Sequence, residues 1–179
     1  MKTSEKSKIF LIGYMGAGKT TVGKLLANRL NWSFIDVDAF IENRYRQTIA
    51  AIFEEKGETA FREIERRTLQ EISGFENTVI STGGGLPCFF DNMDMMNRTG
   101  ITVYLKTDID DLVNRLNYEK QKRPLIKGKN KEELRAFIET SLAKREPFYK
   151  QASIIFNVQN CFTKKEMEQW IDELLNKFL

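Results

Sequence analysis

The chain has 179 residues, 41% hydrophobic and 30% charged, which is typical of one compact domain. It contains no histidine, which excludes Ser-His-Asp and Cys-His catalysis and every His-ligated metal site. The formal net charge of +3 and the lack of a long apolar segment argue against nucleic-acid and membrane partners. Two cysteines, Cys88 and Cys161, form neither a CxxC pair nor a disulfide framework, so we expect a cytoplasmic location.

Short apolar segments alternate with longer segments of helical periodicity. Segments with the β-branched, continuously apolar character of buried strands are 8–12, 33–37, 78–81, 101–105 and 153–156. Apolar residues recur at helical spacing in 20–30, 61–72 and 134–142, and a capping box at 163–166 predicts a last helix. This alternation predicts an α/β fold, a three-layer doubly wound parallel sheet forming one domain over 1–179, with ligands at the carboxyl ends of its strands.

A Walker A motif stands between the first strand and the first helix. The segment 13–20, GYMGAGKT, fits GxxxxGK[ST] in the strand–loop–helix context that the motif requires. Glycines let backbone N–H groups approach phosphate oxygens, and the helix presents the positive end of its dipole. Lys19 would neutralise the β- and γ-phosphates, and the Thr20 hydroxyl would ligate Mg²⁺. The expected ATP-binding residues of this loop are Gly13, Gly16, Ala17, Gly18, Lys19, Thr20 and Thr21.

Two aspartates follow at the end of the second strand. Asp36 and Asp38 stand two residues apart, so on a strand both would face the same side. One could support Mg²⁺ while the other meets a substrate hydroxyl. Alternatively, Asp38 only caps the next helix, 39–45. The third strand leads into glycines without a Walker B aspartate, which leaves Asp36 as the carboxylate for the metal.

Three later segments carry polar side chains or glycines in unusual density. At FREIE, 61–65, and the residue after it, Arg62, Glu65 and Arg66 share one helical face, which is also the pattern of a surface ion-pair row. In STGGG, 81–85, three glycines would let the backbone approach a ligand closely, although a plain turn is the alternative. The segment 117–131 holds six basic residues against one acid, and is either a solvated loop or a mobile lid over phosphates.

Six motifs occur in the order that is typical of shikimate kinases: GYMGAGKTTVGKLLANRL, FIDVD, FREIE, STGGG, KRPLI and KREPFY. The chain resembles that family over residues 9–156. The resemblance implies a P-loop kinase fold, similar to nucleoside monophosphate kinases, with sheet order 2-3-1-4-5. It also implies a substrate-binding region at about 38–70 and a lid at about 117–131.

The same resemblance implies an activity, partners and residue roles. The family transfers the γ-phosphate of ATP to the 3-hydroxyl of shikimate in the chorismate route to aromatic amino acids. We expect a monomer with one Mg²⁺ per subunit.

The implied catalytic residues are Lys19, Asp38 and Arg123. The implied substrate-binding residues are Asp38, Arg62, Gly83, Gly84, Gly85 and Arg145, with the two arginines on the shikimate carboxylate and Phe53 and Phe61 walling the pocket. Arg115 and Arg123 would join the Walker loop on ATP, and Thr20 and Asp36 would hold the metal.

Phosphoryl transfer fits the residue types, because it requires positioning and charge neutralisation rather than a histidine or cysteine nucleophile. A protein kinase is disfavoured, since the chain has no HRD or DFG set. Two rival functions remain open: a related P-loop kinase for another small metabolite such as gluconate, and a non-enzymatic ATP-binding regulator.

Overall fold

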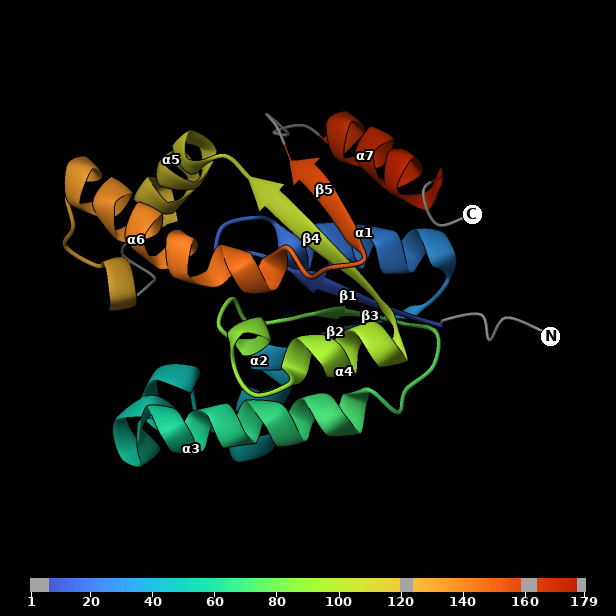
Figure 1. Cartoon of the computed structure of the whole chain (residues 1–179), viewed down its shortest axis with the longest axis horizontal. Helices are drawn as coiled ribbons and strands as arrows, with labels where there is room; N and C mark the ends of the chain where they lie inside the picture. The colour runs from blue at the N-terminus through green and yellow to red at the C-terminus, as the bar shows by residue number, and fades with distance from the viewer. Residues whose placement is uncertain (1–6, 120–123, 159–163, 177–179) are drawn as a thin grey trace.

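The computed structural model describes residues 7–119, 124–158 and 164–176. Within these ranges the chain forms a five-stranded, all-parallel sheet of order β2-β3-β1-β4-β5, which confirms the expected order (Figure 1). The strands are β1 Lys8–Ile12, β2 Ser33–Asp36, β3 Thr78–Ser81, β4 Ile101–Thr107 and β5 Ile154–Val158. β4 extends two residues beyond its predicted end, and the others lie within two residues of prediction.

Helices connect these strands. The α-helices are α1 Lys19–Leu30, α2 Val37–Tyr45, α3 Ile49–Ile72, α4 Asn92–Thr99, α5 Ile109–Glu119, α6 Lys131–Tyr149 and α7 Lys164–Asn176, with 3₁₀ turns η1 Leu86–Cys88 and η3 Pro124–Ile126. The sequence did not predict α4 and α5. Thr163 of the predicted capping box lies outside the described residues. No helix within the described ranges is long and apolar enough to cross a membrane.

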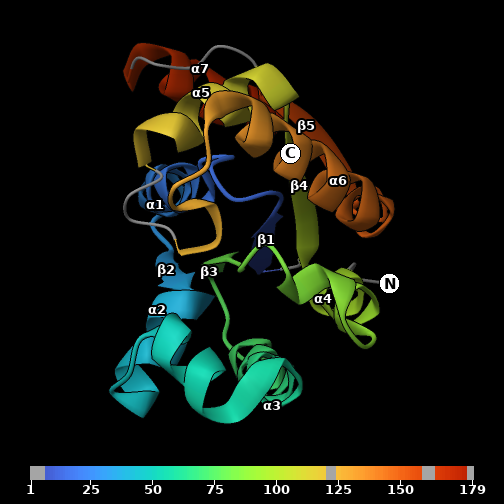
Figure 2. The ribbon, with the colours of Figure 1, turned by 90° about the vertical axis from the view of Figure 1, so that its left-hand side faces the viewer.

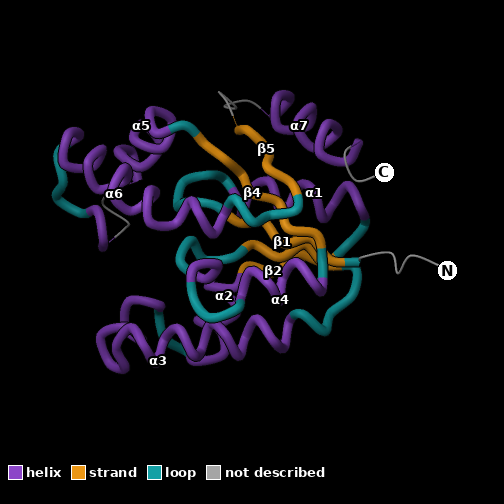
Figure 3. Tube along the Cα trace, in the orientation of Figure 1, coloured by secondary structure: helices purple, strands orange, loops and turns teal. Residues whose placement is uncertain are grey.

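The sheet lies between two layers of helices, as predicted. Alternation along β1 sends Phe10 and Ile12 into one core cluster, and Ile9 and Leu11 into another. The first cluster includes residues of α3, α4, α5 and α6, and the second includes residues of α1 and α7. Figure 2 shows these layers from the side, and the strands in Figure 3 run between helices. Both faces are covered, which explains why the strands are continuously apolar.

The two aspartates do not lie together on a strand, so that prediction is wrong. β2 ends at Asp36, and α2 begins with Val37. Asp36 is the N-cap, because its carboxylate accepts a hydrogen bond from the backbone N–H of Ala39 at 3.3 Å. Asp38 lies in the first turn of α2 and is therefore not the cap. The helix begins earlier than the apolar pattern indicated.

α3 is longer than predicted, and it contains a break. It begins at Ile49, after the N-cap Thr48, so 61–65 does not open the helix. Gly57 interrupts the helical backbone with φ 78° and ψ 172°, which places 61–65 close to the start of the second part. The basic segment 117–131 begins within α5 and ends at the first residue of α6, where Asn130 and Glu133 form a capping box. Residues 120–123 of that segment lie outside the described part of the chain.

Candidate active site

The Walker loop joins β1 to α1 in a conformation that only glycine adopts readily. Gly13, Gly16 and Gly18 have φ values of 142°, 81° and 88°. A Cβ built on Gly13 would lie 2.9 Å from the Leu105 carbonyl oxygen, so β4 also leaves no room for a side chain there. The glycine spacing that identified the motif therefore has a steric cause in this chain.

Lys19 lies at the first turn of α1 and is folded back over the loop. Its ammonium donates hydrogen bonds to the carbonyl oxygens of Gly13, at 2.8 Å, and Tyr14, at 2.9 Å. The residue is only 9% exposed. Its positive charge is thus held beside the loop where phosphate oxygens would lie.

A pocket of about 700 Å³ opens over the Walker loop at the carboxyl ends of the strands. It is lined by residues 15–22 of the loop and α1, by Asp36 and Asp38, by 81–84 after β3, and by residues of α5 and α7. Arg115 of α5 lines it and donates a hydrogen bond to the Gly16 carbonyl oxygen at 3.2 Å. The structure therefore brings the predicted ATP and metal residues of the described ranges to one pocket, except Gly13, which does not line it, whereas Arg123 lies outside those ranges.

Thr20 and Asp36 form a pair of oxygen donors in this pocket. The Thr20 hydroxyl donates a hydrogen bond to Oδ2 of Asp36 at 2.8 Å. Because the hydroxyl uses its hydrogen in this bond, its lone pairs remain available to a cation. Asp36 also caps α2 through Oδ1, so the carboxylate is fixed by the helix that it begins.

Asp38 lies in the same region and is half-buried. Burial, followed by the nearby charge of Asp36, raises the pKa of its carboxyl, and the Lys19 ammonium opposes that rise. A Cβ built on Gly83 would lie 2.8 Å from Oδ1 of Asp38, so the backbone after β3 approaches the carboxylate closely. Asp38 is therefore a carboxylate with raised proton affinity at the inner wall of the pocket.

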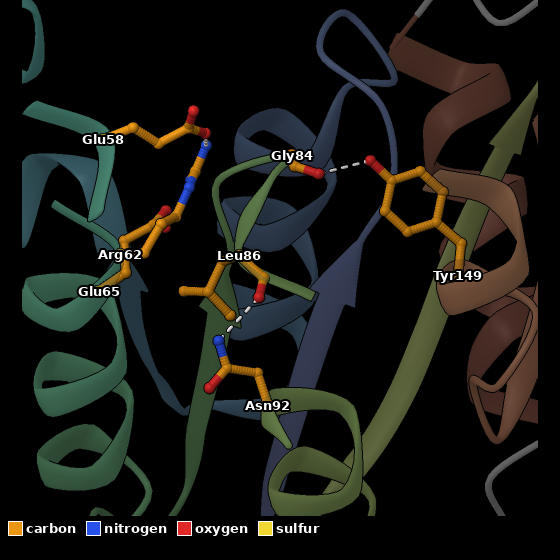
Figure 4. Close-up of polar contacts among 7 residues, drawn as sticks. All are labelled: Glu58, Arg62, Glu65, Gly84, Leu86, Asn92 and Tyr149. Atoms are coloured by element: carbon orange, nitrogen blue, oxygen red, sulfur yellow. Dashed lines mark hydrogen bonds and ion pairs between the residues drawn. The ribbon is translucent and has the colours of Figure 1, made fainter. Parts of the chain in front are cut away.

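The three consecutive glycines each face a different charged side chain. Gly83 faces Asp38. A Cβ on Gly84 would lie 3.3 Å from Nη1 of Arg145, and one on Gly85 would lie 2.8 Å from Nη1 of Arg62. Tyr149, near the end of α6, donates a hydrogen bond from its hydroxyl to the Gly84 carbonyl oxygen at 2.5 Å (Figure 4). The segments around 38, 62 and 145 thus meet at the glycine turn 83–85. The sequence could suggest this contact only through the family resemblance.

Arg62 is not part of a surface ion-pair row, although it is ion-paired. Its side chain is 11% exposed, and its guanidinium bonds to Oε2 of Glu65 at 2.6 Å and Oε1 of Glu58 at 3.1 Å. The Phe89 ring centroid lies 4.2 Å from its Cζ, and the rings of Phe53 and Phe61 lie at 5.5 and 5.4 Å. Its buried Nε has no hydrogen-bond partner within the described residues.

Arg62 and Arg145 adjoin the pocket beyond the glycine turn and do not line it themselves. Arg145 also lies over the Tyr14 ring, with its Cζ 5.5 Å from the ring centroid. A Cβ on Gly84 would also lie 3.5 Å from the Gly13 carbonyl oxygen and from the Met15 backbone nitrogen, so Arg145 and the Walker loop adjoin the same side of Gly84.

The sequence assigned no role to Glu65, and the structure singles it out. It is 2% exposed, and burial raises the pKa of its carboxyl to about 7, although the charge of Arg62 and its hydrogen bond oppose the rise. Its spacing of three residues from Arg62 was the available signal, but the same spacing occurs on exposed helices. Glu58 and Phe89 were missed as well, and their relation to Arg62 depends on the Gly57 break and on the turn after β3.

The Walker loop lies on an all-parallel sheet of this order and opens into a pocket that contains a pair of oxygen ligands. These features define a P-loop kinase that transfers phosphate from ATP. A sequence model described as "Shikimate kinase" matches residues 15–177. The shikimate kinase of Parabacteroides distasonis is 54% identical over 172 residues, which cover 96% of this chain and 99% of that protein. The chain belongs to the shikimate kinase family.

Solved structures agree with this assignment. The crystal structure of shikimate kinase from Bacteroides thetaiotaomicron matches with a TM-score of 0.92 and 51% identity, over 95% of this chain and 97% of that one. Shikimate kinase from Acinetobacter baumannii in complex with shikimate matches with a TM-score of 0.81 and 33% identity, over 96% and 94% of the two chains. A gluconokinase from Sinorhizobium meliloti, at 15% identity and a TM-score of 0.59, shares the fold alone.

Proposed function

We propose that this protein transfers the γ-phosphate of ATP to the 3-hydroxyl of shikimate, giving shikimate 3-phosphate and ADP. The observation that carries the proposal is the convergence of Asp38, Arg145 and Arg62 on the three glycines beside the Walker pocket. A carboxylate-bearing polyol needs such a set, with two cations for its carboxylate and one carboxylate for a hydroxyl. The Acinetobacter baumannii relative binds shikimate.

The nucleotide half of the site positions ATP and neutralises its charge. The N–H groups of the loop 13–18 and the first turn of α1, including Thr21, would cradle the phosphates. Lys19 would exchange its bonds to carbonyl oxygens for phosphate oxygens, and Arg115 would lie against the adenine. Arg123, which we expect beside the transferring phosphoryl group, rests on the resemblance.

A magnesium ion fits the pair of oxygen donors formed by Thr20 and Asp36. Both atoms are hard oxygen ligands 2.8 Å apart in the pocket, as Mg²⁺ prefers, and few protein ligands suffice where phosphates and water supply the rest. When bound, the ion would neutralise charge on the phosphate oxygens. We propose one such ion per subunit.

The substrate half of the site orients the acceptor hydroxyl. Arg62 and Arg145 would bind the shikimate carboxylate, with N–H contacts from Gly84 and Gly85. Asp38 would accept a hydrogen bond from the 3-hydroxyl, and its raised pKa makes it a stronger proton acceptor than an exposed aspartate. Phe53 and Phe61, whose ring centroids are 4.4 Å apart, would form the apolar wall of this half.

We further propose a single kinase domain with a substrate-binding region at about 38–70 and a lid at about 117–131. We also propose a monomer in the cytoplasm; the location fits the one described cysteine, Cys88, which is free and half-buried.

A coupled ADP-release assay tests the proposed function directly. We expect ADP release to depend on shikimate, with gluconate and nucleoside monophosphates giving only the background rate. Transfer to gluconate or to a nucleotide without transfer to shikimate would overturn the proposal. ATP binding without any acceptor-dependent ADP release would favour the regulator instead.

A further inference from the structure

Arg62 forms ion pairs with two carboxylates of its own helix. Glu65 takes Nη1 at 2.6 Å, and Glu58 takes Nη2 at 3.1 Å (Figure 4). One guanidinium charge is therefore shared between two acids of the same helix. A third carboxylate, from a ligand, would have to approach this occupied group.

The two glutamates differ sharply in environment. Glu65 has 2% of its side chain exposed, and its bond to Arg62 is the shorter one. The Glu58 side chain is 61% exposed, so it can leave Arg62 for water at little loss. Glu58 is thus the exchangeable partner and Glu65 the fixed one.

Arg62 does not need Glu58 to hold its position. The guanidinium lies among the rings of Phe53, Phe61 and Phe89, and the Gly85 backbone approaches it closely. Together with Glu65 these contacts fix both its plane and its depth. Removing Glu58 should therefore free Nη2 without displacing the guanidinium.

Glu58 is the first residue after the break at Gly57. Gly57 has φ 78° and ψ 172°, and a Cβ built there would meet no atom within 4 Å. Glu58 therefore begins the second part of α3, and because its side chain is 61% exposed it can swing away without breaking the packed face of the helix.

Charge balance favours that movement when a carboxylate ligand arrives. Arg62, Arg145 and Lys19 contribute three positive charges, and Asp38, Glu58 and Glu65 can contribute three negative ones. Adding a ligand carboxylate without releasing an acid would bring like charges together. Releasing the exposed one relieves that repulsion.

We propose that Glu58 occupies Arg62 in place of the substrate carboxylate and is displaced by it, so that this internal competitor sets the apparent affinity for shikimate. This inference rests on the proposed function, because it assumes that Arg62 binds the substrate carboxylate. Glu58 acts through Arg62 and touches no reacting atom.

Calorimetric binding of shikimate to Glu58→Gln, together with its KM and kcat, tests the proposal. The variant should bind shikimate roughly 1.5- to 5-fold more tightly, as expected for loss of one exposed competing ion pair. KM should fall by a similar factor, with kcat changing less. The uncharged methyl ester of shikimate should gain nothing, because it does not compete for the guanidinium. Glu54→Gln, an exposed residue of α3 with the same charge change, is the matched control and should leave shikimate affinity unaltered.

The outcomes separate this inference from the proposed function. Unchanged or weaker shikimate binding by Glu58→Gln, alongside strongly weakened binding by Arg62→Ala, would overturn the competitor and leave the carboxylate clamp intact. An equal gain for the acid and the ester, or for Glu54→Gln, would also overturn it. Normal shikimate binding by Arg62→Ala would refute the clamp and the competitor together.

Discussion

Gly85→Ala is expected to weaken substrate binding without weakening the fold. Gly85 has φ −87° and ψ −28°, which alanine adopts freely, so the perturbation is the added methyl group alone. Its Cβ would lie 2.8, 2.9 and 3.0 Å from Nη1, Nη2 and Cζ of Arg62. Ordinary contact begins at 3.4 Å, so the guanidinium must retreat by about 0.6 Å. Its bond to Glu65 and the Phe89 ring oppose that retreat.

The magnitude follows from the sensitivity of positioned groups. A misplacement of about 1 Å can cost roughly 100-fold, so we expect Gly85→Ala to lose on the order of tenfold in kcat/KM, mainly through KM for shikimate. The unfolding free energy should change by less than about 1 kcal/mol, because the ~0.4–1 kcal/mol gained by restricting the unfolded chain offsets the cost of displacing the guanidinium.

A double-mutant cycle with Arg62→Ala gives the decisive readout for Gly85→Ala. If the methyl group acts by displacing the guanidinium, Gly85→Ala should have almost no further effect once Arg62 is gone. Steady-state kinetics on the four proteins, with denaturation in urea as the stability control, measures this coupling. A KM within twofold of wild type, or losses that simply multiply in the double variant, would refute the reasoning.

Two further perturbations test other parts of the site. Lys19→Ala should lower kcat at least about 100-fold with a normal circular dichroism spectrum, since it removes a charge aimed at the transferring phosphoryl group; turnover within a fewfold of wild type contradicts this. Glu65 has a pKa raised from 4.5 to about 7, so its stabilising contribution is complete below about pH 4.5 and is lost as pH rises through about 7. That loss amounts to at most about 3 kcal/mol. Urea denaturation at about pH 5 and about pH 8 should show that the free energy of unfolding depends less on pH in Glu65→Gln than in wild type. An equal pH dependence in the two proteins would disprove the assignment.

The sheet and the phosphate loop could be predicted from the sequence, because both depend on local residue patterns. Buried parallel strands read as β-branched apolar runs, and the Walker glycines are required by positive φ values in a fixed strand–loop–helix context. α4 was not predicted because its segment, NMDMMNRT, is only eight residues long and is polar on average. The prediction that Asp36 and Asp38 share a strand failed at a strand–helix boundary. There the capping side chain of Asp36 decides at which residue the helix begins.

The substrate half of the site was less accessible to sequence reasoning. The helical spacing of Arg62 and Glu65 is identical in an exposed ion pair and in a buried cluster, so burial had to come from the fold. The convergence of Arg62 and Arg145 on Gly84 and Gly85 joins positions more than 80 residues apart in the chain. Only the family resemblance could anticipate that contact, because no local pattern encodes it.

The comparison of shikimate with its methyl ester tests the central claim most directly. If Arg62 and Arg145 bind the carboxylate, the ester cannot form the charged bonds to either guanidinium, and Glu58 stays on Arg62. Loss of one partner of such a charged bond costs on the order of 2–5 kcal/mol, or roughly 30- to 4,000-fold. We therefore predict that the wild-type protein phosphorylates shikimate with a kcat/KM at least about 30-fold above that for the ester, at equal affinity for ATP. An ester phosphorylated as efficiently as shikimate would contradict the assignment of this site.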